Sequence, residues 1–139
     1  MEKANGSRFA DGTAAMQTAT PAFGSTVLLF DRHPLFAASL EAMLRDLGAA
    51  SIHVAEDVAA AFAFAPQPGV SLAVLEWIDG CAQLAALVER LEAAKTAVVL
   101  LSVYPRHYIA KAETSRLAVL QKPFADREMQ DAIGRVAAG

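Results

Sequence analysis

The sequence contains little cysteine and little charge. One cysteine among 139 residues excludes a disulfide framework and a cysteine-based metal site. Charged residues make up 19% of the chain and the formal net charge is -3, which argues against a nucleic-acid-binding protein, because such a protein normally has a basic face. No apolar run reaches the roughly 18 residues that span a bilayer, and the first residues lack the apolar core of a secretory signal. We therefore expect a cytoplasmic protein with no direct contact to nucleic acid or membrane.

Hydrophobic residues are abundant instead, at 55% of the chain, and they occur in short runs. A chain of 139 residues fits one domain with a sizeable core. Residues 1–25 are rich in Ala, Gly, Thr and Ser and show no periodicity. We expect residues 1–25 to form a flexible N-terminal arm, and residues 26–139 to form the folded domain.

Five short apolar runs predict β-strands. Runs that are apolar on both faces are typical of strands buried in a parallel sheet. The predicted strands are Thr26–Phe30, Ser51–Ala55, Leu72–Glu76, Ala97–Ser102 and Leu117–Gln121. Helical spacing, Pro34 at a first turn and acidic residues at a helix start predict helices between and after them. These helices are Pro34–Leu47, Glu56–Phe64, Cys81–Ala94, Tyr104–Ser115 and Ala125–Ala138.

This alternation of strands and helices predicts a flavodoxin-like (βα)5 fold. Such a fold is a three-layer α/β sandwich around a parallel five-stranded sheet, and the expected strand order is 2-1-3-4-5. The order places the first and third strands side by side in the middle of the sheet. Asp31 and Glu76 follow or end these two strands, so we expect both carboxylates to face one crevice at the carboxyl edge, where ligands of such sheets gather.

Four patches of sequence carry a family resemblance: LLFDRHPLF, AVLEWIDG, VVLLSVYP and VLQKPF. They place Asp31, Glu76, Ser102 and Lys122–Pro123 each just past or at the end of a strand, and they resemble the receiver domains of two-component response regulators. The resemblance covers roughly residues 26–137. It implies an acidic pocket with Mg²⁺, an aspartate that takes a phosphoryl group, a hydroxyl and a lysine that contact the phosphate, and a cis bond before the proline.

The sequence departs from the receiver pattern at several positions. Phe30 stands where the first of two metal-binding acids is expected, and Glu76 stands at the phosphoacceptor position. Its extra methylene carries the carboxylate about 1.5 Å further, and a misplacement of about 1 Å can cost on the order of a hundredfold in rate. Val103 replaces a small residue, and Val119 replaces the aromatic switch residue. We therefore expect no phosphorylation, no cofactor, and at most a weak Mg²⁺ site at Asp31 and Glu76.

These departures suggest a receiver that signals without phosphorylation and without catalysis. The carboxylate of Glu76 is expected to lie near the ammonium of Lys122 and the hydroxyl of Ser102, where it would resemble the interaction that phosphorylation creates. The expected partner is a histidine kinase, a phosphotransfer protein or a separate output protein, since no output domain is expected after residue 139. Tyr104, Tyr108 and Val119 mark the expected switch and partner face, which would also support a homodimer.

Two other functions remain open from the residues. The first is a conventional receiver with Mg²⁺-dependent phosphoryl transfer, in which Glu76 or Asp79 accepts the phosphoryl group. The second is a flavodoxin-like cofactor binder, although no predicted strand leads into a Gly-rich phosphate loop. Two of these residues could instead have a purely structural role. Asp31 could cap the next helix, and Ser102 could be a polar residue that ends its strand.

Overall fold

The computed structural model describes residues 26–103, 114 and 116–138. The expected arm, residues 1–25, lies outside the described residues. So does most of the helix expected at Tyr104–Ser115, together with Tyr104 and Tyr108 of the expected partner face. Thr114 is described, and it forms an isolated antiparallel bridge with Leu117.

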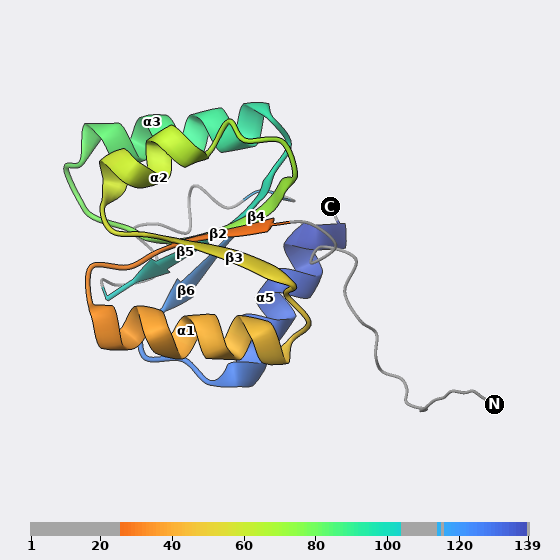
Figure 1. The fold of residues 1–139 in the computed structure, drawn as a ribbon. Coiled ribbons are helices and arrows are strands. Elements are labelled where there is room, and N and C mark those ends of the chain that lie inside the picture. The colour runs from red at the N-terminus through yellow and green to blue at the C-terminus, as the bar shows by residue number, and fades with distance from the viewer. Residues whose placement is uncertain (1–25, 104–113, 115, 139) are drawn as a thin grey trace.

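Within the described residues, five strands form one parallel sheet (Figure 1). They are β2 (Thr26–Phe30), β3 (Ser51–Ala55), β4 (Val70–Glu76), β5 (Ala97–Ser102) and β6 (Leu117–Gln121). Their spatial order is β3-β2-β4-β5-β6, which confirms the 2-1-3-4-5 order expected for a flavodoxin-like sheet. The central pair is therefore β2 and β4, the strands that lead to Asp31 and Glu76.

The helices cover both faces of the sheet and complete three layers. They are α1 (Pro34–Asp46), α2 (Val58–Phe64), α3 (Ala82–Ala93) and α5 (Asp126–Ala138). Figure 1 shows α2 and α3 together on one face and α1 with α5 on the other. Local sequence explains the helix starts: α1 has a proline in its first turn, and the Asp57 carboxylate accepts a hydrogen bond of 2.8 Å from the Ala60 N–H at the start of α2.

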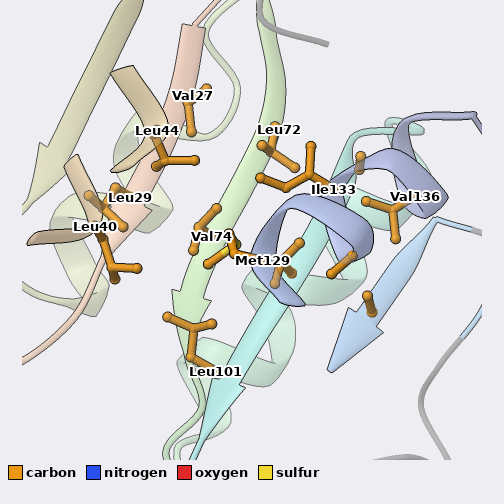
Figure 2. Packing of buried hydrophobic residues seen from close by; sticks show 14 of the residues in the cluster. Val27, Leu29, Leu40, Leu44, Leu72, Val74, Leu101, Met129, Ile133 and Val136 are labelled. Carbon is orange, nitrogen blue, oxygen red and sulfur yellow. The ribbon is translucent and has the colours of Figure 1, made fainter. Parts of the chain in front are cut away.

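Alternate strand residues feed two apolar clusters, one on each face. On the α1/α5 face, Val27, Leu29, Leu72 and Val74 meet residues of the two helices, as Figure 2 shows for Leu40, Leu44, Met129, Ile133 and Val136. The intervening residues of the same strands, such as Leu28 and Ala73, pack under α2 and α3. Burying each Leu or Val side chain stabilises the fold by about 1.5–3 kcal/mol. Two filled faces explain why the strands are continuously apolar.

The register of the sheet brings its polar residues to one edge. Phe30 pairs with Leu75, Glu76 with Leu101, and Ser102 with Gln121, so the strands end at nearly the same level. Two loops are also fastened to β5 by backbone hydrogen bonds of 2.7 Å: the N–H of Trp77 donates to the carbonyl of Leu101, and the N–H of Lys122 donates to the carbonyl of Ser102. In the part of the chain that the structure describes, no helix is long and apolar enough to cross a membrane.

Candidate functional site at the carboxyl edge of the sheet

The predicted site residues gather at the carboxyl edge of the sheet. Asp31 follows β2, Glu76 ends β4, Ser102 ends β5 and Lys122 follows β6. The first three are buried, and the Lys122 side chain is nearly so. Such burial is unusual for charged groups unless they are paired. This edge is where the flavodoxin-like topology brings strand ends together, and the four residues lie there, at the ends of neighbouring strands.

Glu76 is held chiefly by Arg32. The backbone N–H of Arg32 donates a hydrogen bond of 2.8 Å to Glu76 Oε1, and Arg32 Nε donates to the same oxygen at 3.2 Å. Arg32 Nη2 donates to Glu76 Oε2 at 3.1 Å. The guanidinium thus engages both carboxylate oxygens, in the bidentate manner that makes arginine–carboxylate pairs strong and geometrically specific.

Lys122 is held chiefly by Asp31. Its Nζ lies 2.6 Å from Asp31 Oδ2 and 3.7 Å from Glu76 Oε2. The ammonium also lies 4.2 Å from the centroid of the Phe36 ring on α1, a cation–π contact. Phe36 in turn meets Phe124 edge-on, with ring centroids 5.9 Å apart. We call Asp31, Arg32, Glu76 and Lys122 the charged quartet.

The quartet differs in one respect from the arrangement that the sequence suggested. Glu76 and Lys122 do lie within ion-pair distance, but the shorter contacts of Glu76 are to Arg32 and the shorter contact of Lys122 is to Asp31. Sequence reasoning overlooked Arg32. The signal that could have found it is a basic residue directly after the acid at the end of the first strand, beside a crevice expected to be acidic.

Asp31 does not cap helix α1. The helix has His33 at its N-cap position with no side-chain capping bond, whereas Asp31 Oδ1 accepts a hydrogen bond of 2.9 Å from the N–H of His33 itself. One carboxylate oxygen therefore fastens the turn between β2 and α1, and the other binds Lys122. The Lys122–Pro123 peptide bond is cis, as the family resemblance implied.

The hydrogen bonds of the quartet keep Glu76 ionised. Burial alone would raise the pKa of the Glu76 carboxyl. The side-chain and backbone hydrogen bonds from Arg32, with the charges of Lys122 and Arg32, outweigh burial and lower its pKa below the ordinary value. The site thus contains two carboxylates and two basic side chains in mutual contact.

Several other residues singled out from the sequence lie elsewhere. Phe30 and Val119 are buried in the apolar cluster under α2 and α3. Asp79 is exposed, and its Oδ1 accepts a hydrogen bond of 3.0 Å from Trp77 Nε1. Val103 is exposed just past β5, and Cys81 packs partly buried against the α2/α3 cluster.

The donor set does not fit the Mg²⁺ that the receiver resemblance implies. Among the described residues, Asp31, His33 and Glu76 can bring one ligand atom each within 4.8 Å of one another. Mg²⁺ needs near-octahedral oxygen ligands, whereas here Asp31 Oδ2 binds the Lys122 ammonium and both Glu76 oxygens bind the Arg32 guanidinium. Two cationic side chains therefore occupy the carboxylates that would have to hold the ion.

Comparison with known proteins supports the same fold. No family model matches the chain. The chain is 29% identical over 101 residues to the phyllosphere-induced regulator PhyR of Methylorubrum extorquens, a match that covers 70% of this chain and 38% of PhyR. The chain thus corresponds to well under half of that relative.

Solved structures of receiver domains resemble the chain more completely. The response regulator receiver protein of Sinorhizobium medicae has a TM-score of 0.68 at 17% identity, covering 83% of this chain and 95% of that protein. The REC domain of the PhyR response regulator of Erythrobacter litoralis has a TM-score of 0.64 at 21% identity, covering 81% of this chain and 88% of that domain. The chain is therefore a receiver-like domain with the fold of response-regulator receivers.

Proposed function

We propose that this chain is a cytoplasmic signalling domain that acts through protein–protein contact and is not phosphorylated. The observation that carries the proposal is the bidentate clasp of Arg32 on Glu76. Glu76 stands at the strand end where receivers carry a phosphoacceptor. Its carboxylate accepts two charge-assisted hydrogen bonds from the Arg32 guanidinium and one hydrogen bond from the Arg32 backbone N–H.

Phosphoryl transfer requires a free carboxylate oxygen and a bound metal ion, and the hydrogen bonds of this site disfavour both. A carboxylate nucleophile attacks in line through a free oxygen, while a metal ion neutralises the charge of the phosphoryl group. Here both Glu76 oxygens accept hydrogen bonds from Arg32. Against the effect of burial, these hydrogen bonds and the nearby positive charges lower the pKa of Glu76, which favours the ionised form. Glu76 also lies 3.7 Å from Lys122, so one carboxylate contacts both cations of the site without any phosphodonor.

A contact role would use the surface around this edge. Leu35, in the first turn of α1, is 87% exposed, and Val103, just past β5, is 57% exposed. Leu35 follows Arg32 by three residues, and Val103 directly follows Ser102, whose carbonyl accepts the N–H of Lys122. Exposed apolar side chains near a fixed charge pattern suit protein recognition. The partner we propose is a signalling protein such as a kinase, a phosphotransfer protein or an output protein, or a second copy of the chain.

The direct test is incubation with acetyl phosphate and Mg²⁺, followed by intact-mass measurement. We expect no acylphosphate on the wild-type chain. The double variant Arg32→Asp/Glu76→Asp, which replaces the guanidinium by a carboxylate and shortens the acceptor, serves as the gain-of-function comparison. Stoichiometric phosphorylation of the wild type would overturn the proposal and favour the conventional phosphoaccepting receiver.

A second test asks whether contact depends on Glu76. In a pull-down with candidate kinases and phosphotransfer proteins, the wild type should bind its partner and Glu76→Ala should bind it more weakly. Glu76→Asp keeps the charge but shortens the reach to Arg32, and it separates charge from geometry. Equal binding by all three forms would contradict a role for Glu76 in partner recognition.

A further inference from the structure

The guanidinium of Arg32 lies where a bound cation would have to contact Glu76. It lies against both oxygens of Glu76, and the backbone N–H of Arg32 binds the same carboxylate. We propose that Arg32 is a resident cation that substitutes for a divalent metal ion, and that removing its guanidinium is enough to let the site bind one. This inference deepens the proposed function and rests on it for the signalling role of the site.

The ligand geometry beneath Arg32 supports this reading. Asp31, His33 and Glu76 can place three ligand atoms within 4.8 Å of one another. Carboxylates and an imidazole together suit a divalent transition metal better than Mg²⁺. Asp31 Oδ2 is taken by Lys122, but Glu76 loses both side-chain hydrogen bonds if the guanidinium is removed. Glu76 then keeps only the backbone N–H of residue 32 and the Lys122 ammonium at 3.7 Å, and its carboxylate can share an ion with Asp31 and His33.

The charge balance gives the same result. Two carboxylates face two cations in the quartet, so a divalent ion added to the wild type would enter a site that is already neutralised. Removing the guanidinium leaves two carboxylates against one ammonium. The net negative charge then favours a dication, and the loss of one positive charge about 4 Å away is worth roughly tenfold or more in affinity.

The exposed fractions of the two side chains indicate that the Arg32 guanidinium lies between solvent and the Glu76 carboxylate. The Arg32 side chain is 52% exposed, whereas the Glu76 side chain is 4% exposed. The half-exposed cation therefore covers a buried anion. An ion arriving from solvent would have to displace Arg32 before it reached Glu76, and a displaced arginine would lose its bidentate hydrogen bonds to the buried carboxylate.

The experiment is a Mn²⁺ titration of the full chain, observed by two signals. One is the fluorescence of Trp77, which directly follows Glu76 and is the single Trp of the sequence. The other is paramagnetic broadening of backbone amide signals by Mn²⁺. The variants are Arg32→Ala and Arg32→Gln, the second being a neutral, hydrogen-bonding replacement that carries the test if the first does not fold.

The matched control is Arg45→Ala. Arg45 lies on α1, and its Nη2 forms an exposed ion pair of 2.8 Å with Glu41, so this variant loses the same charge away from the site. The double variant Arg32→Ala/Glu76→Gln removes the liberated carboxylate as well, and it tests whether any new ion binding uses Glu76.

We expect the wild type and Arg45→Ala to show no saturation over the titrated Mn²⁺ range, and Arg32→Ala or Arg32→Gln to saturate at concentrations at least roughly tenfold below the upper end of that range. Broadening should centre on the amides around residues 31–33 and 76–77, and the double variant should lose it. Saturable Mn²⁺ binding by the wild type at Glu76, or no gain in folded Arg32 variants, would overturn the inference.

The two proposals can fail separately. Mn²⁺ binding by the wild type without acylphosphate formation would remove the role of Arg32 and leave the unphosphorylated signalling domain intact. Acylphosphate on the wild type together with metal binding only in the Arg32 variants would do the reverse.

Discussion

The charged quartet consists of two ion pairs. We call Lys122 with Asp31 the sealed half, and Arg32 with Glu76 the open half. In the sealed half, the side chains of Lys122 and Asp31 are 9% and 0% exposed, and Phe36 covers the ammonium. In the open half, Glu76 is as buried as Asp31, but its partner Arg32 is half in solvent. Both halves are ion pairs between the same kinds of groups, yet they stand in different dielectric surroundings.

This difference separates structural from exchangeable charge. A buried pair gives little net stability over apolar packing, but breaking it is costly because the remaining charge stays buried and uncompensated. A pair with one partner in solvent has a smaller penalty, because the exposed partner can be hydrated when the contact breaks. The Lys122 half should therefore hold the fold together, while the Arg32 half can respond to other molecules.

The largest expected effect is therefore at Lys122. Lys122→Ala leaves the fully buried Asp31 carboxylate without its 2.6 Å partner, and we expect the free energy of unfolding to fall by about 3–5 kcal/mol. Urea unfolding followed by circular dichroism measures this. The double variant Lys122→Met/Asp31→Asn, which removes both charges, should recover much of the loss; no recovery would mean that the lost stability is not due to the stranded charge.

Arg32→Ala should have a smaller effect on stability. It removes two side-chain hydrogen bonds to Glu76, but Glu76 keeps the backbone N–H of residue 32 and Lys122 at 3.7 Å. We expect a loss of about 1–2 kcal/mol, after discounting for the exposed guanidinium. The same unfolding experiment checks it. A loss equal to that of Lys122→Ala would erase the distinction between the halves.

Acid should weaken the open half through Glu76. Its pKa is lowered in the folded protein from the ordinary value of 4.5, so the unfolded chain binds more protons than the folded one in the acidic range. The resulting stability is present above about pH 4.5 and is lost as the pH falls through the lower pKa of the folded state. Urea unfolding at a series of pH values should show a flatter acid decline for Glu76→Gln than for the wild type. Parallel curves would contradict this.

The smallest expected effect is at the exposed pair of α1. Arg45→Ala removes an i, i+4 contact to Glu41 in which both side chains are partly exposed, and we expect a loss of about 0.3–0.5 kcal/mol. Added salt should shrink this difference further by screening. Thermal unfolding at low and high salt checks both, and a salt-independent loss would point to lost packing by the arginine stem instead.

The fold was predictable because its main determinants are local. Strands apolar on both faces must lie inside a parallel sheet, and the alternation with helices leaves few topologies. The differences lie at element ends. Strand β4 begins at Val70 and not at Leu72, because Val70 pairs with Thr26. Helix α3 runs from Ala82 to Ala93, because Cys81 and Ala94 are its caps.

The site was predictable in position but not in pairing. Strand ends place Asp31, Glu76, Ser102 and Lys122 at one edge, and topology alone requires this. The choice of partner depends on how far each side chain reaches and which oxygen it meets. In the sequence, Phe30 stands where a metal-binding acid is expected, and its side chain packs under α2 and α3. Its neighbour Arg32 had the greater consequence, because it reaches across from β2 to the end of β4.

The two backbone hydrogen bonds onto the end of β5 have a mechanical consequence. Adjacent carbonyls, those of Leu101 and Ser102, are claimed by the loops that follow β4 and β6. Trp77 and Lys122 are thus anchored to adjacent residues of β5, the strand that lies between β4 and β6. A ligand that pulled the loop after Glu76 outward would load Leu101, whose neighbour Ser102 anchors Lys122. A mechanical coupling between the open and the sealed half through these two residues would require no helix to move.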